Sequence, residues 1–189
     1  MRRPLIVLAL LLAACSSGDP KPQPTATLTP SIPDVKVYVG LSHVHLKKGD
    51  AVPDYPQSPP VGGTHSPAWL KCQVYTSDLP KQNAVHSMEH GGVWITYRPD
   101  LAAADITTLE QMQNLNKEFV LISPYVGQTA PVVVSTWGLQ LTATGANDSR
   151  IGDFVRTYAG GEQGGEKGVG CASTGVSLAD ALAYNAHQK

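Results

Sequence analysis

The residues most able to do chemistry form the stretch His86-Ser87-Met88-Glu89-His90, which holds two imidazoles, a carboxylate and a thioether. On a helix, positions i, i+3 and i+4 share a face, so His86, Glu89 and His90 would meet in the H-x-x-E-H spacing of some zinc hydrolases. On a strand, positions i, i+2 and i+4 share a face, so His86, Met88 and His90 would form a nitrogen and sulfur set suited to copper. The competing interpretation is a pair of structural histidines, because short motifs match by chance.

The residues that follow this stretch limit its backbone. Gly91 and Gly92 come directly after it, and glycine commonly ends a helix. We therefore expect a single helical turn here, capping a strand over residues 93–97 that is rich in β-branched and aromatic side chains. That strand would give the two histidines a rigid base.

Three further histidines lie upstream. His43 and His45 alternate along a strand expected over residues 35–46, which would place them on one face. His65 lies in the segment 50–67, whose prolines and Gly62-Gly63 pair exclude a regular helix or a central strand and predict a stiff, extended loop. A fold that brings this loop beside the strand would add imidazoles to the same site.

The remaining pattern predicts an α+β fold, a single domain with a mixed β-sheet flanked by short helices. Strands are expected at 119–123, 131–137 and 139–143, and helices at 106–116, 150–158 and 177–186. Asp105 and Ser177 are the expected caps of the first and last of these helices. The glycine-rich segment 159–170 is expected to be a mobile loop.

The amino terminus has the pattern of an exported bacterial lipoprotein. Arg2 and Arg3 precede an apolar run, and Leu12-Ala13-Ala14-Cys15 has the form of a lipobox, although an ordinary cleaved signal with an incidental cysteine is the alternative. The predicted organisation is a lipoprotein signal peptide at 1–14, a disordered Ser/Pro/Thr-rich tether at 15–34 and one globular domain at 35–189.

The net charge of the chain and the length of its apolar run limit the kinds of partner that the protein can have. The apolar run of the signal is too short to span a bilayer, so we expect attachment through lipid on Cys15, in the cell envelope outside the cytoplasm. Without Arg2 and Arg3 the chain has 12 basic and 15 acidic residues, a net charge of about −3, and no basic run. Nucleic acid is therefore not an expected partner.

Once Cys15 carries lipid, two cysteines are left. In a compartment that oxidises thiols, Cys72 and Cys171 are expected to form a disulfide that closes a loop of about 100 residues. The competing interpretation makes Cys72 a thiolate ligand near His86.

Several motifs together resemble a known family. The run from Tyr55 to Trp69, Cys72, the stretch from Asn83 to Gly91, Ser123-Pro124-Tyr125 and Ser135-Thr136-Trp137-Gly138 resemble the bacterial family catalogued as domain of unknown function 3105. The resemblance covers roughly residues 36–175. It implies an exported or membrane-tethered domain and brings no established activity.

The resemblance also favours particular residues. His65, Cys72, His86, Glu89 and His90 match the family's motif positions, as does His45. Met88 stands where leucine is common in the family, which weakens the copper set that a strand would give.

The leading hypothesis is an extracytoplasmic lipoprotein that binds a transition metal through a histidine cluster, copper ahead of zinc. His65, His86 and His90 are the expected ligands, with Glu89 as a fourth ligand or as the carboxylate that fixes an imidazole tautomer. His45, Met88 and Cys72 are further candidates. One alternative is a zinc-dependent hydrolase with Glu89 as general base, and the other is a metal-free binding or structural module.

Overall fold

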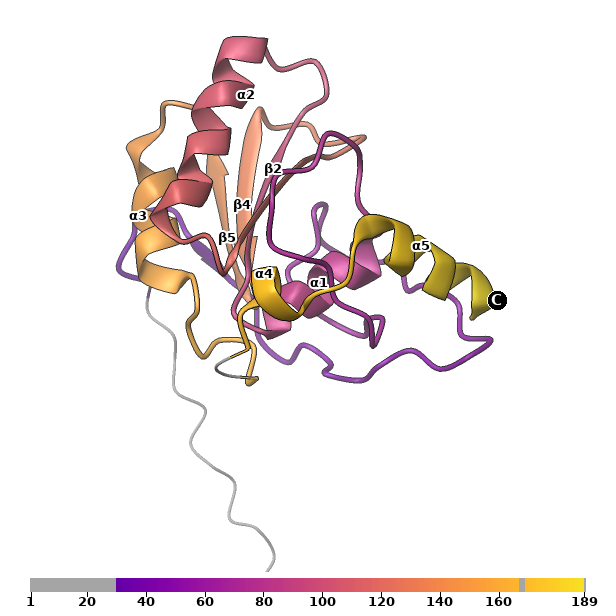
Figure 1. Ribbon diagram of the computed structural model, residues 1–189. Helices are drawn as coiled ribbons and strands as arrows, with labels where there is room; N and C mark the ends of the chain where they lie inside the picture. The colour runs from indigo at the N-terminus through magenta and orange to yellow at the C-terminus, as the bar shows by residue number, and fades with distance from the viewer. Residues whose placement is uncertain (1–29, 167–168, 189) are drawn as a thin grey trace, which may run out of the picture.

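A five-stranded mixed β-sheet runs through the centre of the protein, in a computed structural model that describes residues 30–166 and 169–188 (Figure 1). The strand order is β1-β5-β4-β2-β3; β2 and β3 are parallel, and the other neighbours are antiparallel. The strands are β1 (Lys36–Val37), β2 (Val93–Tyr97), β3 (Val120–Pro124), β4 (Val132–Thr136) and β5 (Leu139–Ala143). The predicted α+β fold is confirmed.

Helices lie on both faces of this sheet, so the domain has three layers (Figure 1). On one face lie α2 (Ala103–Glu110), its 3-10 continuation η1 (Gln111–Leu115) and α3 (Ser149–Tyr158). Towards the other face lie α1 (Lys81–Glu89), α4 (Cys171–Thr174) and α5 (Leu178–His187). Within the described ranges no helix combines the length and apolar character needed to cross a bilayer.

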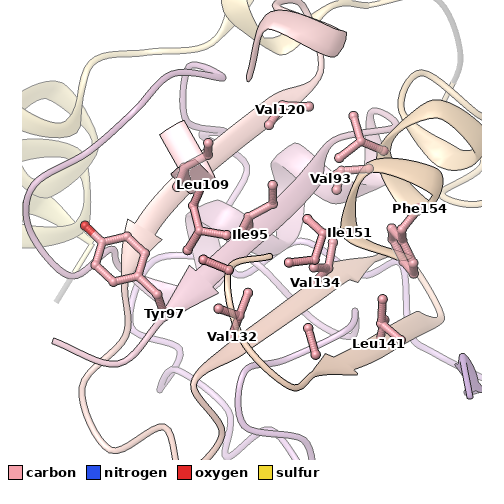
Figure 2. Close-up of a cluster of buried hydrophobic side chains, with 14 of the residues drawn as sticks. Val93, Ile95, Tyr97, Leu109, Val120, Val132, Val134, Leu141, Ile151 and Phe154 are labelled. Carbon is pink, nitrogen blue, oxygen red and sulfur yellow. The ribbon is translucent and has the colours of Figure 1, made fainter. Parts of the chain in front are cut away.

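The face covered by α2 and α3 is apolar because alternate strand residues point to it. Val93 and Ile95 of β2 pack there with Val134 of β4, and Ile151 and Phe154 of α3 close the layer (Figure 2). Every residue of β2 is buried, which matches its β-branched and aromatic sequence.

The opposite face has a second apolar cluster, and it supports α1. Trp94 from β2 and Trp137 from the β4–β5 turn pack there with Val85 and Met88 of α1. The turn itself depends on Gly138, whose φ of +72° is one that side chains rarely adopt.

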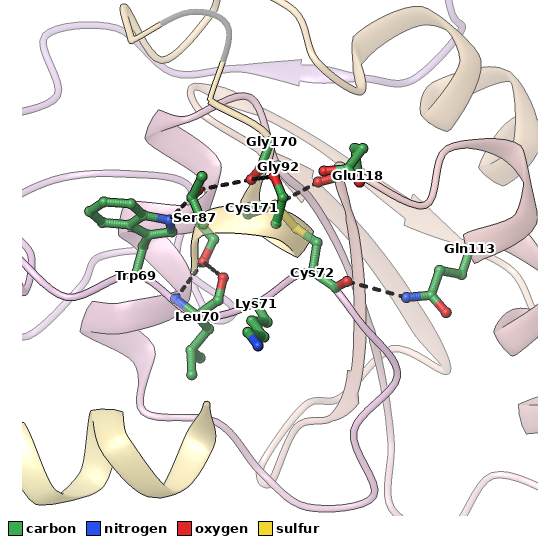
Figure 3. Close-up of a disulfide and its surroundings, with 12 residues drawn as sticks. Trp69, Leu70, Lys71, Cys72, Ser87, Gly92, Gln113, Glu118, Gly170 and Cys171 are labelled. Atoms are coloured by element: carbon green, nitrogen blue, oxygen red, sulfur yellow. Dashed lines mark hydrogen bonds between the residues drawn. A yellow bond between two sulfur atoms is a disulfide. The ribbon is translucent and has the colours of Figure 1, made fainter. Parts of the chain in front are cut away.

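A disulfide joins Cys72 to Cys171 across 99 residues of sequence (Figure 3). The same two segments also pair through their backbones, because Lys71 N–H donates to Val176 O at 3.0 Å and Val176 N–H donates to Trp69 O at 2.9 Å. The short helix α4 is thereby fixed beside the segment that precedes α1. Because its sulfur is bonded to Cys171, Cys72 is not a thiolate ligand.

Several local expectations are corrected. The strand expected over 35–46 is only two residues long as β1, because past it the chain turns to pair with the proline-rich loop through a His45–His65 bridge. Asp105 lies inside the first turn of α2 and caps nothing, since α2 begins earlier than expected. Ser177 does cap α5, because its hydroxyl accepts from Asp180 N–H.

The amino-terminal boundary also differs from the expected one. Ile32, assigned to the tether, is buried in the apolar cluster below α3, and Asp34 pairs with Arg150 at 2.6 Å. The packed domain therefore extends a few residues before 35. The expected signal peptide, Cys15 and most of the tether lie outside the described residues.

We expect the disulfide to be a main source of stability. Replacing Cys72 or Cys171 with Ser should lower the free energy of unfolding by as much as about 4–5 kcal/mol, because an unfolded chain with a 100-residue loop closed loses about that much entropy in the chain model. Urea denaturation measures the loss. The double variant should lose no more than either single variant, because one bond is removed in all three; additive losses, or unlinked Cys72 and Cys171 peptides in unreduced protein, would contradict the pairing.

Candidate metal centre

The helix α1 carries the motif residues and is almost wholly buried. Eight of its nine residues are buried. With nine residues it is longer than the single turn expected. It begins after Pro80 and ends at Glu89; its C-cap His90 is followed by Gly91, which has a φ of +86°. Gly92 N–H then donates to Ser87 O at 2.9 Å, in a glycine-terminated end that leaves no room for a Cβ at Gly92.

The helical period separates the side chains of α1 into two buried faces. Val85 and Met88 pack against the sheet in the second apolar cluster, whereas His86 and Glu89 lie on the other side. Met88 is therefore not a metal ligand, and the copper set that a strand would have given does not form. The helical interpretation of the spacing holds.

The polar face of α1 is fixed to the segment 66–70 by side-chain hydrogen bonds. Ser87 Oγ accepts from Leu70 N–H at 3.0 Å and donates to Leu70 O at 2.9 Å (Figure 3). Asn83 Nδ2 donates to Ala68 O at 2.6 Å, and its Oδ1 accepts from Asn185 of α5 at 2.7 Å. These bonds satisfy polar groups that the burial of the helix would otherwise leave unpaired.

The proline-rich loop brings His65 to this face. Leu46 N–H donates to His65 O at 2.7 Å, and His65 N–H donates to Val44 O at 3.1 Å. This short backbone pairing places the rings of His45 and His65 4.7 Å apart at their centroids. The segment 43–46 and the loop therefore reach α1 together.

Two of the imidazoles have their tautomer fixed by backbone carbonyls. His86 Nδ1 lies 2.6 Å from Ser66 O, and His65 Nδ1 lies 2.7 Å from Gly63 O. A carbonyl only accepts, so Nδ1–H is the donor in both rings, and each neutral ring presents an Nε2 lone pair. His65 Nε2 lies 2.8 Å from Glu89 Oε2, and His86 Nε2 lies 4.0 Å from the same oxygen. Histidines that bind metals through one ring nitrogen usually donate a hydrogen bond from the other nitrogen to a carbonyl or a carboxylate.

Four donor atoms converge at this point, one each from His45, His65, His86 and Glu89, all within 4.8 Å of one another. Glu89 Oε2 lies 2.8 Å from His65 Nε2, 3.7 Å from His45 Nε2 and 4.0 Å from His86 Nε2. Ligand bonds of about 2.0–2.1 Å in a tetrahedral site separate the donors by about 3.3–3.4 Å. The spacings lie on both sides of that value, so the group could hold a metal ion.

The closest pair of donors has no hydrogen-bond partner. His65 Nε2 and Glu89 Oε2 are both buried, and although they lie 2.8 Å apart, neither makes a hydrogen bond among the described residues. Two lone pairs facing each other in a buried site repel, and an unpaired buried polar atom costs free energy. A cation bound by both atoms would satisfy both.

Burial and neighbouring charges set the protonation of the group. Burial, with smaller contributions from the adjacent imidazoles, lowers the pKa of His86 to about 3. Burial alone would raise the pKa of the Glu89 carboxyl, but positive charge on the adjacent His65 and His43 rings outweighs it and lowers that pKa to about 2. At neutral pH the site therefore offers a neutral imidazole and an ionised carboxylate, the forms that bind metals.

His43 supports the group from outside. Its Nδ1 lies 2.5 Å from Glu89 Oε1, and its ring stacks on Trp137 at 4.4 Å between centroids. The ring therefore holds one carboxylate oxygen and leaves Oε2 for the other donors. The alternation of His43 and His45 was the only sequence signal for this role.

His90 differs most from expectation. It follows α1 as its C-cap, and its Nε2 lies 3.0 Å from His86 Nε2 and 3.3 Å from Glu166 Oε2. The expected trio His65, His86 and His90 is therefore not the tight group, in which His45 takes the place of His90. The physical reason is that His90 lies at the helix end and faces the loop that carries Glu166, a residue that no sequence motif indicates.

Comparison with known proteins gives a match to a family model. A sequence model of the family described as "Protein of unknown function (DUF3105)" matches residues 45–173. The matched range begins at His45 and includes the other three donors and both bonded cysteines. No curated protein and no solved structure matches the chain.

The low pKa of His86 predicts an acid-sensitive metal-free protein. Between about pH 6.5, the usual pKa of an unfolded histidine, and pH 3, the unfolded state binds a proton that the folded state does not, so stability falls as pH falls. One such group contributes at most about 1.4 kcal/mol per pH unit. In chelator, urea denaturation at pH 7, 6 and 5 should show this slope, and His86→Gln should reduce it. Exposed His187 supplies the matched control, so a slope changed equally by His187→Gln would contradict the assignment.

Proposed function

The chain belongs to the DUF3105 family, whose description leaves the function open, and we propose that its domain binds one transition metal ion through His45, His65, His86 and Glu89. The observation that carries the proposal is the buried pair His65 Nε2 and Glu89 Oε2, 2.8 Å apart and without hydrogen bonds. A shared cation gives both atoms a partner. The fixed tautomers of His65 and His86 support the same conclusion.

The donor set narrows the choice of ion. Three imidazoles and one carboxylate, with no thiolate or thioether, fit Cu(II) and Zn(II), and exclude the sulfur-rich ligation that Cu(I) prefers. The Irving–Williams order places Cu(II) above Zn(II) at a given nitrogen and oxygen site. Copper is therefore the first candidate and zinc the second.

The four donors differ in exposure, and this favours a protein that takes up and holds an ion. The side chain of His65 is fully buried and that of Glu89 is 3 % exposed, whereas that of His45 is 41 % exposed. The ion would be held mainly from within and reached past His45. With the lipobox before the domain, we place this activity in the cell envelope outside the cytoplasm, in metal binding or delivery.

The hydrolase alternative finds less support. A general base works best when its pKa is near the working pH, and the pKa of Glu89 is about 2. His43 occupies Oε1, and His65 lies against Oε2. Glu89 therefore serves better as a ligand than as a base for a metal-bound water.

We expect wild-type protein to bind one Cu(II) or Zn(II) ion per chain in a calorimetric titration. His65→Ala and His86→Ala should each weaken the binding at least about 100-fold, because removing a ligand should cost no less than the 10–100-fold seen for outer partners. His187→Ala, at the exposed end of α5, is the control and should bind as wild type. Absence of stoichiometric binding by wild type, or equal affinities in all four proteins, would refute the proposal.

We expect the mature protein to begin at lipid-modified Cys15 and to fractionate with membranes, because the lipobox precedes a tether with few large apolar residues. Cys15→Ser should release the protein to the soluble fraction. Ser16→Ala is the matched control and should stay with the membrane. If Cys15→Ser protein partitions like wild type, the lipid anchor is wrong.

A further inference from the structure

Beside the group just described lies a second set of donors, formed by His86, His90 and Glu166. His90 Nε2 lies 3.0 Å from His86 Nε2 and 3.3 Å from Glu166 Oε2. The His90 side chain is 6 % exposed, and its buried Nδ1 has no hydrogen-bond partner among the described residues. We call His45, His65, His86 and Glu89 the inner set, and His86, His90 and Glu166 the outer set.

The two sets share His86, whose ring has only one nitrogen available to bind a metal ion. Its Nδ1–H is used by Ser66 O at 2.6 Å, so only Nε2 can bind an ion. Nε2 lies 4.0 Å from Glu89 Oε2 on the inner side and 3.0 Å from His90 Nε2 on the outer side. A neutral imidazole nitrogen binds one ion, so the two sets cannot both be filled through His86.

The outer set is built into the fold by close backbone packing. Gly160 N–H donates to Gly91 O at 2.9 Å, and Gly164 lies so near the backbone of Glu89 that a Cβ there would collide with Glu89 O. The loop that carries Glu166 is therefore seated on the end of α1. The Trp69 ring lies beside both histidines of the outer set, with its centroid 5.0 Å from that of His86 and 4.5 Å from that of His90.

The outer set is more exposed to solvent than the inner set, so an ion from solution would reach the outer set first. The Glu166 side chain is 49 % exposed, whereas His65 and Glu89 are buried. An ion at the outer set would touch solvent beside Glu166, and an ion at the inner set would be open to solvent beside His45, 41 % exposed, but enclosed on the sides of His65 and Glu89.

We propose that His86, His90 and Glu166 form an outer metal position that passes a single divalent ion to and from the inner set, with His86 bound throughout. The proposal rests on the proposed function, because it needs the inner set to bind the same ion. In the transfer, His90 and Glu166 leave the ion as His65, His45 and Glu89 bind it, so the ion is never without protein ligands. No electron transfer is required. Because His86 Nε2 accepts from His90 Nε2–H in the metal-free protein, His90 would bind the ion through Nε2 after that proton moves to its unpartnered Nδ1.

The test uses the purified full chain, with Cu(II) alone as the probe. Equilibrium dialysis measures the number of ions bound and their affinity, and electron paramagnetic resonance reports the ligands. Wild type should bind one Cu(II). His65→Ala, which damages only the inner set, should still bind one Cu(II), more weakly and with a spectrum of fewer imidazole nitrogens. Adding Glu166→Gln to His65→Ala should weaken binding by a further 10–100-fold or so, as expected for loss of a carboxylate contact. Circular dichroism checks folding, and Glu89→Gln replaces His65→Ala if that variant does not fold.

A kinetic arm tests the passage itself. Glu166→Gln alone should slow release of Cu(II) to excess EDTA about tenfold relative to wild type, whereas Glu110→Gln on α2, across the sheet, should release as wild type. Two Cu(II) ions bound per wild-type chain, no binding by either inner-set variant, or unchanged release from Glu166→Gln would each overturn the outer position. The last two results leave the proposed function standing. Failure of wild type to bind any ion would overturn both proposals.

Discussion

The placement of one buried carboxylate, Glu89, governs the architecture on this side of the sheet. An ionised carboxylate taken out of water is strongly destabilising unless charge or hydrogen bonds compensate it. Here the compensation comes from the chain before α1: His43 holds Oε1, and His65 lies against Oε2, where a shared cation would complete it. The proline-rich loop therefore has to close over the helix.

The sheet and the disulfide supply the stiffness that such a site needs. Val85 and Met88 fix α1 to the sheet from below, and Ser87 fixes it to Leu70 from the side. Leu70 lies two residues from Cys72, whose bond to Cys171 ties this segment to the carboxyl-terminal part of the chain. Donor atoms held by packed neighbours keep their positions better than donors on free loops.

The sequence could predict those features that depend on neighbouring residues, and it could not predict those that depend on contacts between distant segments. The four main strands were placed within one or two residues, because β-branched content and turn glycines act over short distances. The length of α1 could not be seen, because both of its faces are buried and the usual contrast between apolar and exposed polar sides is missing. Its motif did predict that His86 and Glu89 share a face. The exchange of His90 for His45, and the contribution of Glu166, depend on how distant loops are seated, which no local pattern encodes.

The bond between Cys72 and Cys171 also bears on when the donors come together in the life of the molecule. In a reducing compartment the two thiols would stay separate, and α4 would lack its covalent link to the segment that carries Trp69 and Leu70. A newly made chain would then hold its imidazoles only loosely while still inside the cell. If the chain is exported as we propose, oxidation after export would fix the imidazoles in the cluster. The protein would then not compete for metal ions in the cytoplasm before it reaches the cell envelope.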